Sequence, residues 1–394
     1  MRGWNRFMKI SLLLLAILFG TQVLVAIVPE RRRPQKSEKP NRYYALPWFI
    51  TIEGVGTMWG GVLGVANILD SGTNFGLVNF QNDKFHVLGA AIDDIYLIGN
   101  YKGFAALTLS AAKTSAKLLE FNAWDVGPDS DKEPMKVRGE LEARAVQLQQ
   151  KLFNDRVRIS LEAYVSRDYI RLANQGEKGE ESTYAGNRFK VELDLTDDRY
   201  DARAGIKASY IVSRHDPEGN FFSKNDSEEV FDLVKKELSI FLPVYASDDH
   251  VHTLAMNFFQ SSLYNRNPDV EVSRRNGHSL GGPMQLRGYP LNRFTDYNSV
   301  HYILEHRWTI VEPFGKDDEP SLISNDSIEG LQFALFHDWG QVSQYNDERL
   351  YQSNMKTSYG AGCRLIFRSG LIIRLDIGIS EEGVGETFLV QQPF

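Results

Sequence analysis

The sequence has almost no cysteine and, beyond Val28, no long hydrophobic run. The single cysteine, Cys363, excludes an intrachain disulfide framework, a cysteine-based zinc site and an amino-terminal lipid-modified cysteine. A mean hydropathy of −0.32 excludes a bundle of transmembrane helices. It does not exclude a transmembrane β-barrel, because the inward half of such a barrel is polar. The formal net charge of −7, with both signs mixed along the chain, argues against a nucleic-acid partner.

Residues 1–26 have the pattern of a secretory signal peptide. Arg2, Arg6 and Lys9 form a positive region, a continuous apolar run follows from Ile10 to Phe19, and Ala26 is the expected residue before cleavage. An uncleaved inner-membrane anchor is the alternative. Both interpretations predict export of the chain.

Residues 27–50 are basic and rich in proline, with Arg31-Arg32-Arg33-Pro34 at their centre. This composition predicts a short flexible segment in the periplasm rather than a folded unit. Roughly twenty residues are too few for a folded periplasmic domain. The remaining residues, 51–394, are expected to form one β-domain.

Alternation of apolar and polar residues recurs along 51–394, in segments of about ten residues separated by polar turns. Residues 156–165 and 188–196 show the alternation most clearly. Strands near ten residues long match the length that a tilted strand needs to cross a bilayer. The pattern predicts an all-β fold, a closed antiparallel transmembrane β-barrel in which about 14 strands can be distinguished; an even number is the rule for such barrels.

Residues 264–297 lack the period of a strand or helix, and a loop of that length usually has a function. They contain a Gly-Gly-Pro turn followed by Leu286, Arg287, Gly288 and Tyr289. Gly288 allows a tight backbone turn, and a buried arginine needs planar acceptors. The prediction is an extracellular loop that folds back into the barrel lumen and is anchored there by Arg287.

The strands expected at 298–311, 330–342, 357–368 and 370–380 carry charged residues of both signs on their lumen face. Arg287 is expected to pair with Asp338 first and with Asp376 second. A static plug and a mobile gating loop both remain open. The residues predicted to share the lumen with Arg287 are Glu305, Arg307, Phe336, Asp338, Gly340, Arg364, Arg374 and Asp376.

These motifs together resemble the bacterial surface antigen superfamily, which includes the BamA/TamA-type outer-membrane assembly barrels and the two-partner-secretion translocators. The resemblance rests on Leu286-Arg287-Gly288-Tyr289 in the loop, on Phe336-x-Asp338-x-Gly340 in a strand and on the terminal Phe394. It is specific from Gly281 onwards and general before that. It implies 16 strands, location in the bacterial outer membrane, and a role in inserting or translocating polypeptides.

The resemblance also implies partners and a carboxyl-terminal signal. Phe388, Val390 and Phe394 are similar to the strand signal by which such barrels are recognised for insertion. The implied partners are outer-membrane lipid, lipopolysaccharide, and a separate periplasmic protein or polypeptide client. Assembly members of the superfamily carry periplasmic POTRA domains, and the length of 27–50 leaves no room for one here.

Two other functions remain as alternatives. A passive or gated diffusion pore follows from the expected lack of a periplasmic domain. A hydrolase would need a catalytic cluster, and the best one is His250 and His252 with Asp248 and Asp249 nearby, a pattern that also suits a solvated turn. The expectation is a protein without enzymatic activity, cofactor or metal.

Overall fold

The computed structural model describes 11 stretches of the chain, which are 41–52, 56–100, 103–129, 134–172, 180–216, 230–311, 328–347, 350–351, 355–367, 371–390 and 393–394. The expected signal peptide, 1–26, and the larger part of the expected basic segment lie outside these residues.

The described part of the chain is built almost entirely of β-strands. Two short 3-10 turns, η1 (Ile68–Asp70) and η2 (Arg274–Asn276), interrupt them. No helix among the described residues is long and apolar enough to span a membrane. The strands are β1 (Arg42–Ile52), β2 (Gly56–Ala66), β3 (Asn74–Gln81), β4 (Phe85–Ile98), β5 (Ala105–Ala123), β6 (Met135–Leu152), β7 (Val157–Leu172), β8 (Glu180–Asp194), β9 (Gly205–Asp216), β10 (Phe231–Ala246), β11 (His250–Asn265), β12 (His278–Leu280), β13 (Phe294–Asp296), β14 (Asn298–Val311), β15 (Ile328–Ser343), β16 (Lys356–Phe367), β17 (Ile372–Ser380) and β18 (Gly383–Val390).

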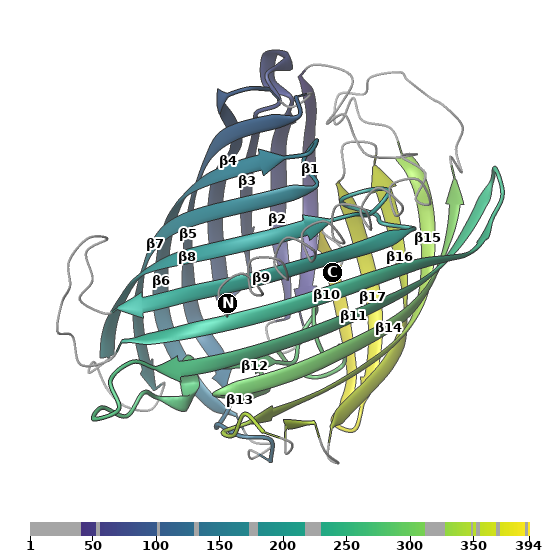
Figure 1. Ribbon diagram of the computed structural model, residues 1–394. Coiled ribbons are helices and arrows are strands. Elements are labelled where there is room, and N and C mark those ends of the chain that lie inside the picture. Colours follow the sequence, from purple (N-terminus) through teal and green to yellow (C-terminus); the bar gives the residue numbers. More distant parts are fainter. Residues whose placement is uncertain are drawn as a thin grey trace, which may run out of the picture.

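The long strands form one antiparallel meander that curls around a central axis (Figure 1). Each strand pairs with the next in sequence, except that β11 pairs with β14, because the two-stranded ribbon β12–β13 lies between them in the chain. The prediction of an all-β antiparallel fold is confirmed.

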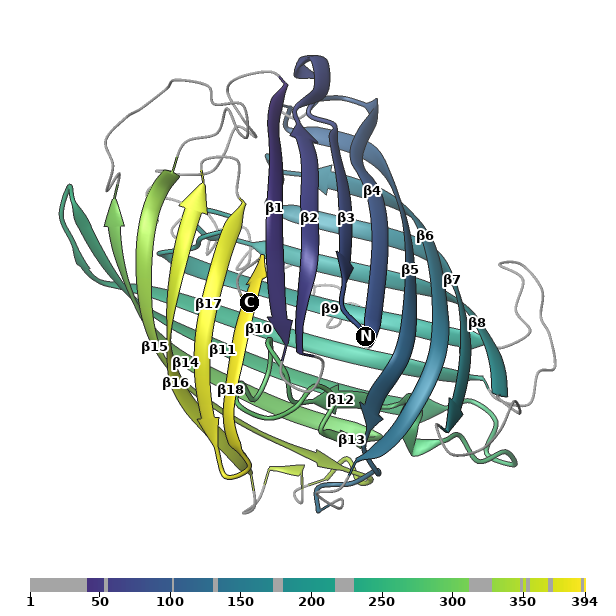
Figure 2. The same ribbon diagram turned by 180° about the vertical axis from the view of Figure 1, so that it is seen from behind.

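The first and last strands, β1 and β18, lie side by side (Figure 2). Their register contains one residue pair, Thr51 with Phe388. On its other side, β1 pairs with β2 along its whole length, from Arg42 opposite Ala66 to Ile52 opposite Gly56. The seam between β1 and β18 is therefore the least paired junction of the sheet among the described residues.

The two faces of each strand differ because successive side chains point to opposite sides of the sheet. In β15, Phe333 and Leu335 are exposed on the outer face, while Ala334, Phe336 and Asp338 are buried on the inner face. The same division holds in β17, where Leu375 and Ile377 are exposed and Arg374 and Asp376 are buried. The outer face is thus apolar and the inner face of these strands carries charge.

The structure corrects one boundary drawn from the sequence and adds two strands to those expected. The barrel was expected to begin at 51, whereas β1 begins at Arg42, so the expected flexible segment 27–50 overlaps a strand. The apolar residues of β1 do not alternate cleanly, and Pro47 interrupts them. β3, only eight residues long, was also missed. With β1 and β3, the fourteen strands expected from the sequence become the sixteen of the large sheet among the described residues.

Candidate functional site

The segment 266–297 folds as a compact unit on the inside of the sheet. The sequence showed no strand or helix period there, but the structure contains η2 and the ribbon of β12 and β13. The two strands of the ribbon are each three residues long, which is too short for an alternating pattern to be recognised in the sequence. Within the unit, Arg274 Nε donates to Asp296 (2.8 Å) and the Tyr297 hydroxyl donates to the Val272 carbonyl (2.6 Å). This internal bonding gives the loop a defined shape.

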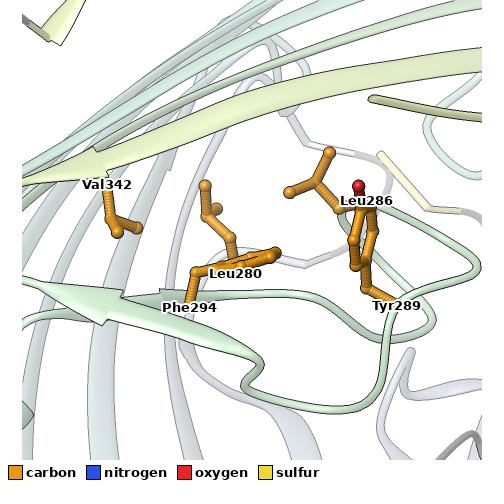
Figure 3. Close-up of a cluster of buried hydrophobic side chains, with 5 residues drawn as sticks. All are labelled: Leu280, Leu286, Tyr289, Phe294 and Val342. Atoms are coloured by element: carbon orange, nitrogen blue, oxygen red, sulfur yellow. The ribbon is translucent and has the colours of Figure 1, made fainter. Parts of the chain in front are cut away.

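An apolar cluster fixes the loop against the wall (Figure 3). Leu280, Leu286, Tyr289 and Phe294 come from the loop, and Val342 comes from β15. All five side chains are buried, and burial raises the pKa of Tyr289 to about 12. The cluster holds the loop motif next to the inner faces of the last strands.

Arg287 lies at the centre of a buried network of charged side chains. Its guanidinium binds Asp338 in a bidentate manner, with Nε donating to Oδ2 (2.8 Å) and Nη2 to Oδ1 (2.6 Å), and its backbone N–H donates to the same carboxylate (3.0 Å). Nη1 donates to Glu305 (2.6 Å) and to Asp376 (3.1 Å). Asp338 is thus the first partner of Arg287, and Glu305 is a closer one than Asp376.

The surroundings of Arg287 keep it charged although it is 1% exposed. Burial would lower its pKa, but the charges of Asp338 and Glu305 outweigh that effect and hold the pKa well above its usual value. The guanidinium carbon lies 3.5 Å from the centroid of the Phe336 ring, a close cation–π contact. Phe336 therefore forms one wall of the arginine site.

Glu305 joins three arginines of the interior. Its Oε1 accepts hydrogen bonds from Arg287 and from Arg364 Nη2 (2.8 Å), and its Oε2 accepts one from Arg307 Nε (2.7 Å). The sequence placed Glu305 on the lumen face but did not predict this central position. We call the seven residues Arg287, Glu305, Arg307, Asp338, Arg364, Arg374 and Asp376 the Arg287 network.

Arg374 connects the network to the backbone of the loop. Its Nη2 donates to the Pro283 carbonyl oxygen (2.8 Å), and its Nη1 lies 3.2 Å from Asp376. An arginine of the wall therefore binds the loop in addition to the loop's own Arg287.

The loop backbone approaches the wall so closely at Gly288 that only glycine fits. Gly288 has a φ of +101°, and a Cβ built on Gly378 of β17 would lie 2.5 Å from the Arg287 carbonyl carbon. The Ser380 hydroxyl donates to the Gly288 carbonyl nearby (2.8 Å). A Cβ built on Gly340 of β15 would lie 2.9 Å from the Val300 carbonyl oxygen of β14 and 3.1 Å from the Leu280 side chain of the loop. Glycine at both 288 and 378 therefore allows the loop backbone and the backbone of β17 to lie in contact.

The structure also reveals contacts that the sequence did not predict. Gln332 of β15 accepts a hydrogen bond from Arg364 Nη1 (3.2 Å) and donates one to Asp201 (2.9 Å). Asp201 belongs to the turn 195–204 between β8 and β9, far from 332 in sequence. Its place in an acidic turn was visible, but no sequence pattern relates that turn to β15.

The predicted carboxyl-terminal signal residues occupy different surroundings. Phe388 stacks on Phe49 of β1, with ring centroids 4.6 Å apart. The side chain of Val390 lies outside the described residues. Phe394 does not continue β18, which ends at Val390; its ring packs in the interior against Phe241, and Arg307 lies over it.

The histidine cluster considered for a hydrolase lies on the outer face instead of at a catalytic constellation. His252 Nδ1 is 3.2 Å from His306 Nε2, and both His250 and His252 contact the ring of Trp308. Among the described residues, no group of three histidine, cysteine or acidic side chains is arranged to hold a metal ion. The neighbours of these histidines are mainly aromatic.

Of the comparisons with known proteins, only the one with solved structures gives matches. Neither family models nor curated proteins give a match. Among solved structures, BamA from Haemophilus ducreyi lacking POTRA domains 1–3 matches with a TM-score of 0.53 and 12% identity, over 89% of this chain and 69% of that one. CdiB from Acinetobacter baumannii matches with a TM-score of 0.55 and 12% identity, over 90% of this chain and 60% of that one.

CdiB from Escherichia coli gives a similar result, with a TM-score of 0.52 and 14% identity over 90% of this chain and 63% of that one. This chain therefore spans less than two thirds of either CdiB. At these identities the similarity concerns the fold. The chain has the β-barrel fold of BamA and CdiB, which confirms at the level of the fold the resemblance to BamA/TamA-type and two-partner-secretion barrels.

Proposed function

We propose that the protein is a bacterial outer-membrane barrel that inserts or translocates polypeptides, with the loop 266–297 held in its lumen by Arg287. The observation that supports this most directly is the bidentate pairing of Arg287 with Asp338. The sequence motifs that carry the family resemblance supply both residues. The fold similarity to BamA and CdiB, both outer-membrane barrels, supports the same location and kind of function.

The proposal includes a closed, 16-stranded transmembrane barrel. The strand order, which returns to β1 through β18, supports closure. Exposed apolar side chains on the outer face, among them Leu161, Phe189 and Leu335, support contact with lipid, including lipopolysaccharide. An export signal at 1–26 and a short flexible periplasmic segment between it and β1 complete the proposal. The poorly paired seam at Thr51 and Phe388 is where a client strand would enter.

A genetic replacement tests the proposed function. A strain carrying Arg287→Ala should contain less of at least one other outer-membrane or surface protein, measured by quantitative proteomics of isolated outer membranes. Arg275→Ala is the matched control, because Arg275 is a loop arginine that is half exposed and outside the Arg287 network. Unchanged levels of all other outer-membrane proteins after complete deletion of the gene would refute the proposal.

A passive or gated pore is the second candidate, and the charged inner face of β7 and β8 favours it. Arg188 and Glu162 form an ion pair there (2.7 Å), in which the arginine side chain is 40% exposed. In the strand order, β7 and β8 are far from β14 to β17, the strands that bind the loop. The exposed arginine side chain indicates that this side of the lumen is accessible to water. A route for solutes beside the loop is consistent with this arrangement.

Conductance distinguishes an occluding loop from a loop that leaves the pore open. In planar bilayers, Arg287→Ala should raise single-channel conductance, because loss of the anchor frees the loop from the lumen. Arg275→Ala should leave the conductance unchanged. Equal conductance of the Arg287→Ala variant and the unaltered protein would show that the docked loop does not restrict the pore.

We also propose that the role is not enzymatic. The outward position of His250 and His252, beside Trp308, supports this, since neither imidazole faces the charged interior. A loss of lipid or peptide hydrolysis on His252→Ala would contradict it.

A further inference from the structure

Two histidines lie where the ribbon β12–β13 meets the wall of the barrel. His278 begins β12, and His301 lies on the inner face of β14, the face that also carries Glu305. The strands β12 and β14 are in contact, and the two imidazoles are close enough to interact electrostatically. Neither histidine belongs to the Arg287 network, so the pair forms a separate contact between the loop and the wall.

His301 is buried beneath the docked loop. Its side chain is 0% exposed. The residues opposite it on the neighbouring strands are Phe259 of β11 and Gly340 of β15. The loop residue Leu280 covers this position, because a Cβ built on Gly340 would lie 3.1 Å from the Leu280 side chain. Release of the loop would therefore expose His301 to the lumen.

His278 belongs to the loop itself, and its imidazole is enclosed although the residue as a whole is only partly buried. The ring centroid lies 4.7 Å from that of Phe259, and Nε2 donates to the side-chain oxygen of Gln285 (3.0 Å). Burial lowers the pKa of His278 to about 3, and the positive charge of Lys235 on β10 adds to this effect. The docked position therefore disfavours a proton on this imidazole.

The acidic groups beside the two histidines already have cationic partners. Asp338, which acts electrostatically on His301, is bound by Arg287. Asp296, opposite the β12 histidine in the ribbon, is bound by Arg274. Neither ring nitrogen of His301 has a hydrogen-bond partner among the described residues. An unpaired buried charge is strongly unfavourable, so a proton on His301 also opposes docking.

Docking of the loop and protonation of its histidine therefore exclude one another. Once the loop is released, the imidazole of His278 meets water and has the ordinary pKa of about 6.5. Because the pKa is lower in the docked form, docking is at full strength above about pH 6.5 and weakens as the pH falls from there towards 3. At pH 5.0 the docking equilibrium falls about 30-fold through His278 alone.

We propose that His278 and His301 form a proton-sensitive latch, which releases the loop 266–297 from the wall when the surroundings become acidic. Acidification then opens the lumen reversibly, and the paired strands of the wall stay as they are. The latch concerns the loop and the wall alone. It needs no polypeptide client, so it stands or falls separately from the proposed function.

Hydrogen–deuterium exchange of the ribbon amides in the purified, folded protein tests the latch. The exchange rates of residues 278–280 and 294–296, corrected for the intrinsic effect of pH on exchange, should rise about 30-fold or more between pH 7.5 and pH 5.0. In the double variant His278→Gln with His301→Gln the rise should be less than about threefold, because glutamine is polar but does not titrate. This variant leaves the carboxylates of the Arg287 network unchanged, so it separates their titration from that of the histidines.

His252→Gln is the matched control, because His252 lies on the outer face beside Trp308. This variant should keep the full rise of the unaltered protein. Folding is verified by the heat-dependent shift in gel mobility. If the double variant does not fold, His278→Gln alone replaces it and should reduce the rise about tenfold or more. An equal rise in the folded double variant and the unaltered protein, or no rise in the unaltered protein, would overturn the proposal.

Discussion

Replacing Arg287 with alanine should destabilise the barrel by about 3–5 kcal/mol, the typical cost of removing one partner from a buried ion pair. Asp338 is fully buried, and its charged partner among the described residues is Arg287 alone. The substitution therefore leaves this buried carboxylate without the ion-pair partner that it has among the described residues. The free energy of unfolding, measured by urea titration in lipid vesicles, should fall by this amount.

A double-mutant cycle separates the pair from the rest of the network. Asp338→Ala alone should cost a similar free energy, whereas Arg287→Ala with Asp338→Ala should cost clearly less than the sum of the two. Arg275→Ala, half exposed, should change the free energy of unfolding little. Additive effects of the two interior substitutions would show that Arg287 and Asp338 do not depend on each other.

Gly378→Ala should expel the loop from the wall without removing any charge. A Cβ at this position would lie 2.5 Å from the Arg287 carbonyl carbon, 2.6 Å from its oxygen and 2.7 Å from the Gly288 nitrogen, all of them backbone atoms. Backbone cannot rotate away as a side chain can, so the loop itself must move. We expect trypsin to cleave after Arg287, which is 1% exposed in the docked loop, many times faster in the variant.

Gly76→Ala is the matched control for this substitution. Gly76 also lies in a strand, β3, but no heavy atom lies within 4 Å of a Cβ built there. Cleavage of this variant should proceed at the rate of the unaltered protein. If Gly378→Ala remained as resistant to trypsin as Gly76→Ala, the docking of the loop on β17 would be wrong.

The last four strands of the sheet could be predicted well from the sequence, for a physical reason. In β15 and β17, charged or small residues alternate with large apolar ones, so the period of two identifies both the strand and its inner face. β1 and β3 lack that contrast. β1 carries a proline within a run of aromatic and aliphatic residues, and β3 has eight residues with asparagine at both faces.

The site could be predicted only in part. The motif at 286–289 and the acidic lumen faces indicated an arginine paired with carboxylates. They did not rank Glu305 above Asp376, because that order depends on how neighbouring strands are staggered, and stagger is fixed by hydrogen bonding across the sheet. The contact of Gln332 with Asp201 joins positions 131 residues apart, which no local pattern encodes. The inward turn of Phe394 was likewise invisible in the sequence.

The distribution of the Arg287 network along the chain has a consequence for the order of assembly. Its members extend from Arg287 to Asp376, and no member comes from the strands before β14. The eleven strands β1 to β11 can therefore pair with one another while none of these charges needs a partner. Burial of the four arginines is fully compensated only when Asp376 of β17, the last carboxylate of the network in sequence, has taken its place beside them. We therefore expect the loop and the last strands to take up their final positions together, late in folding.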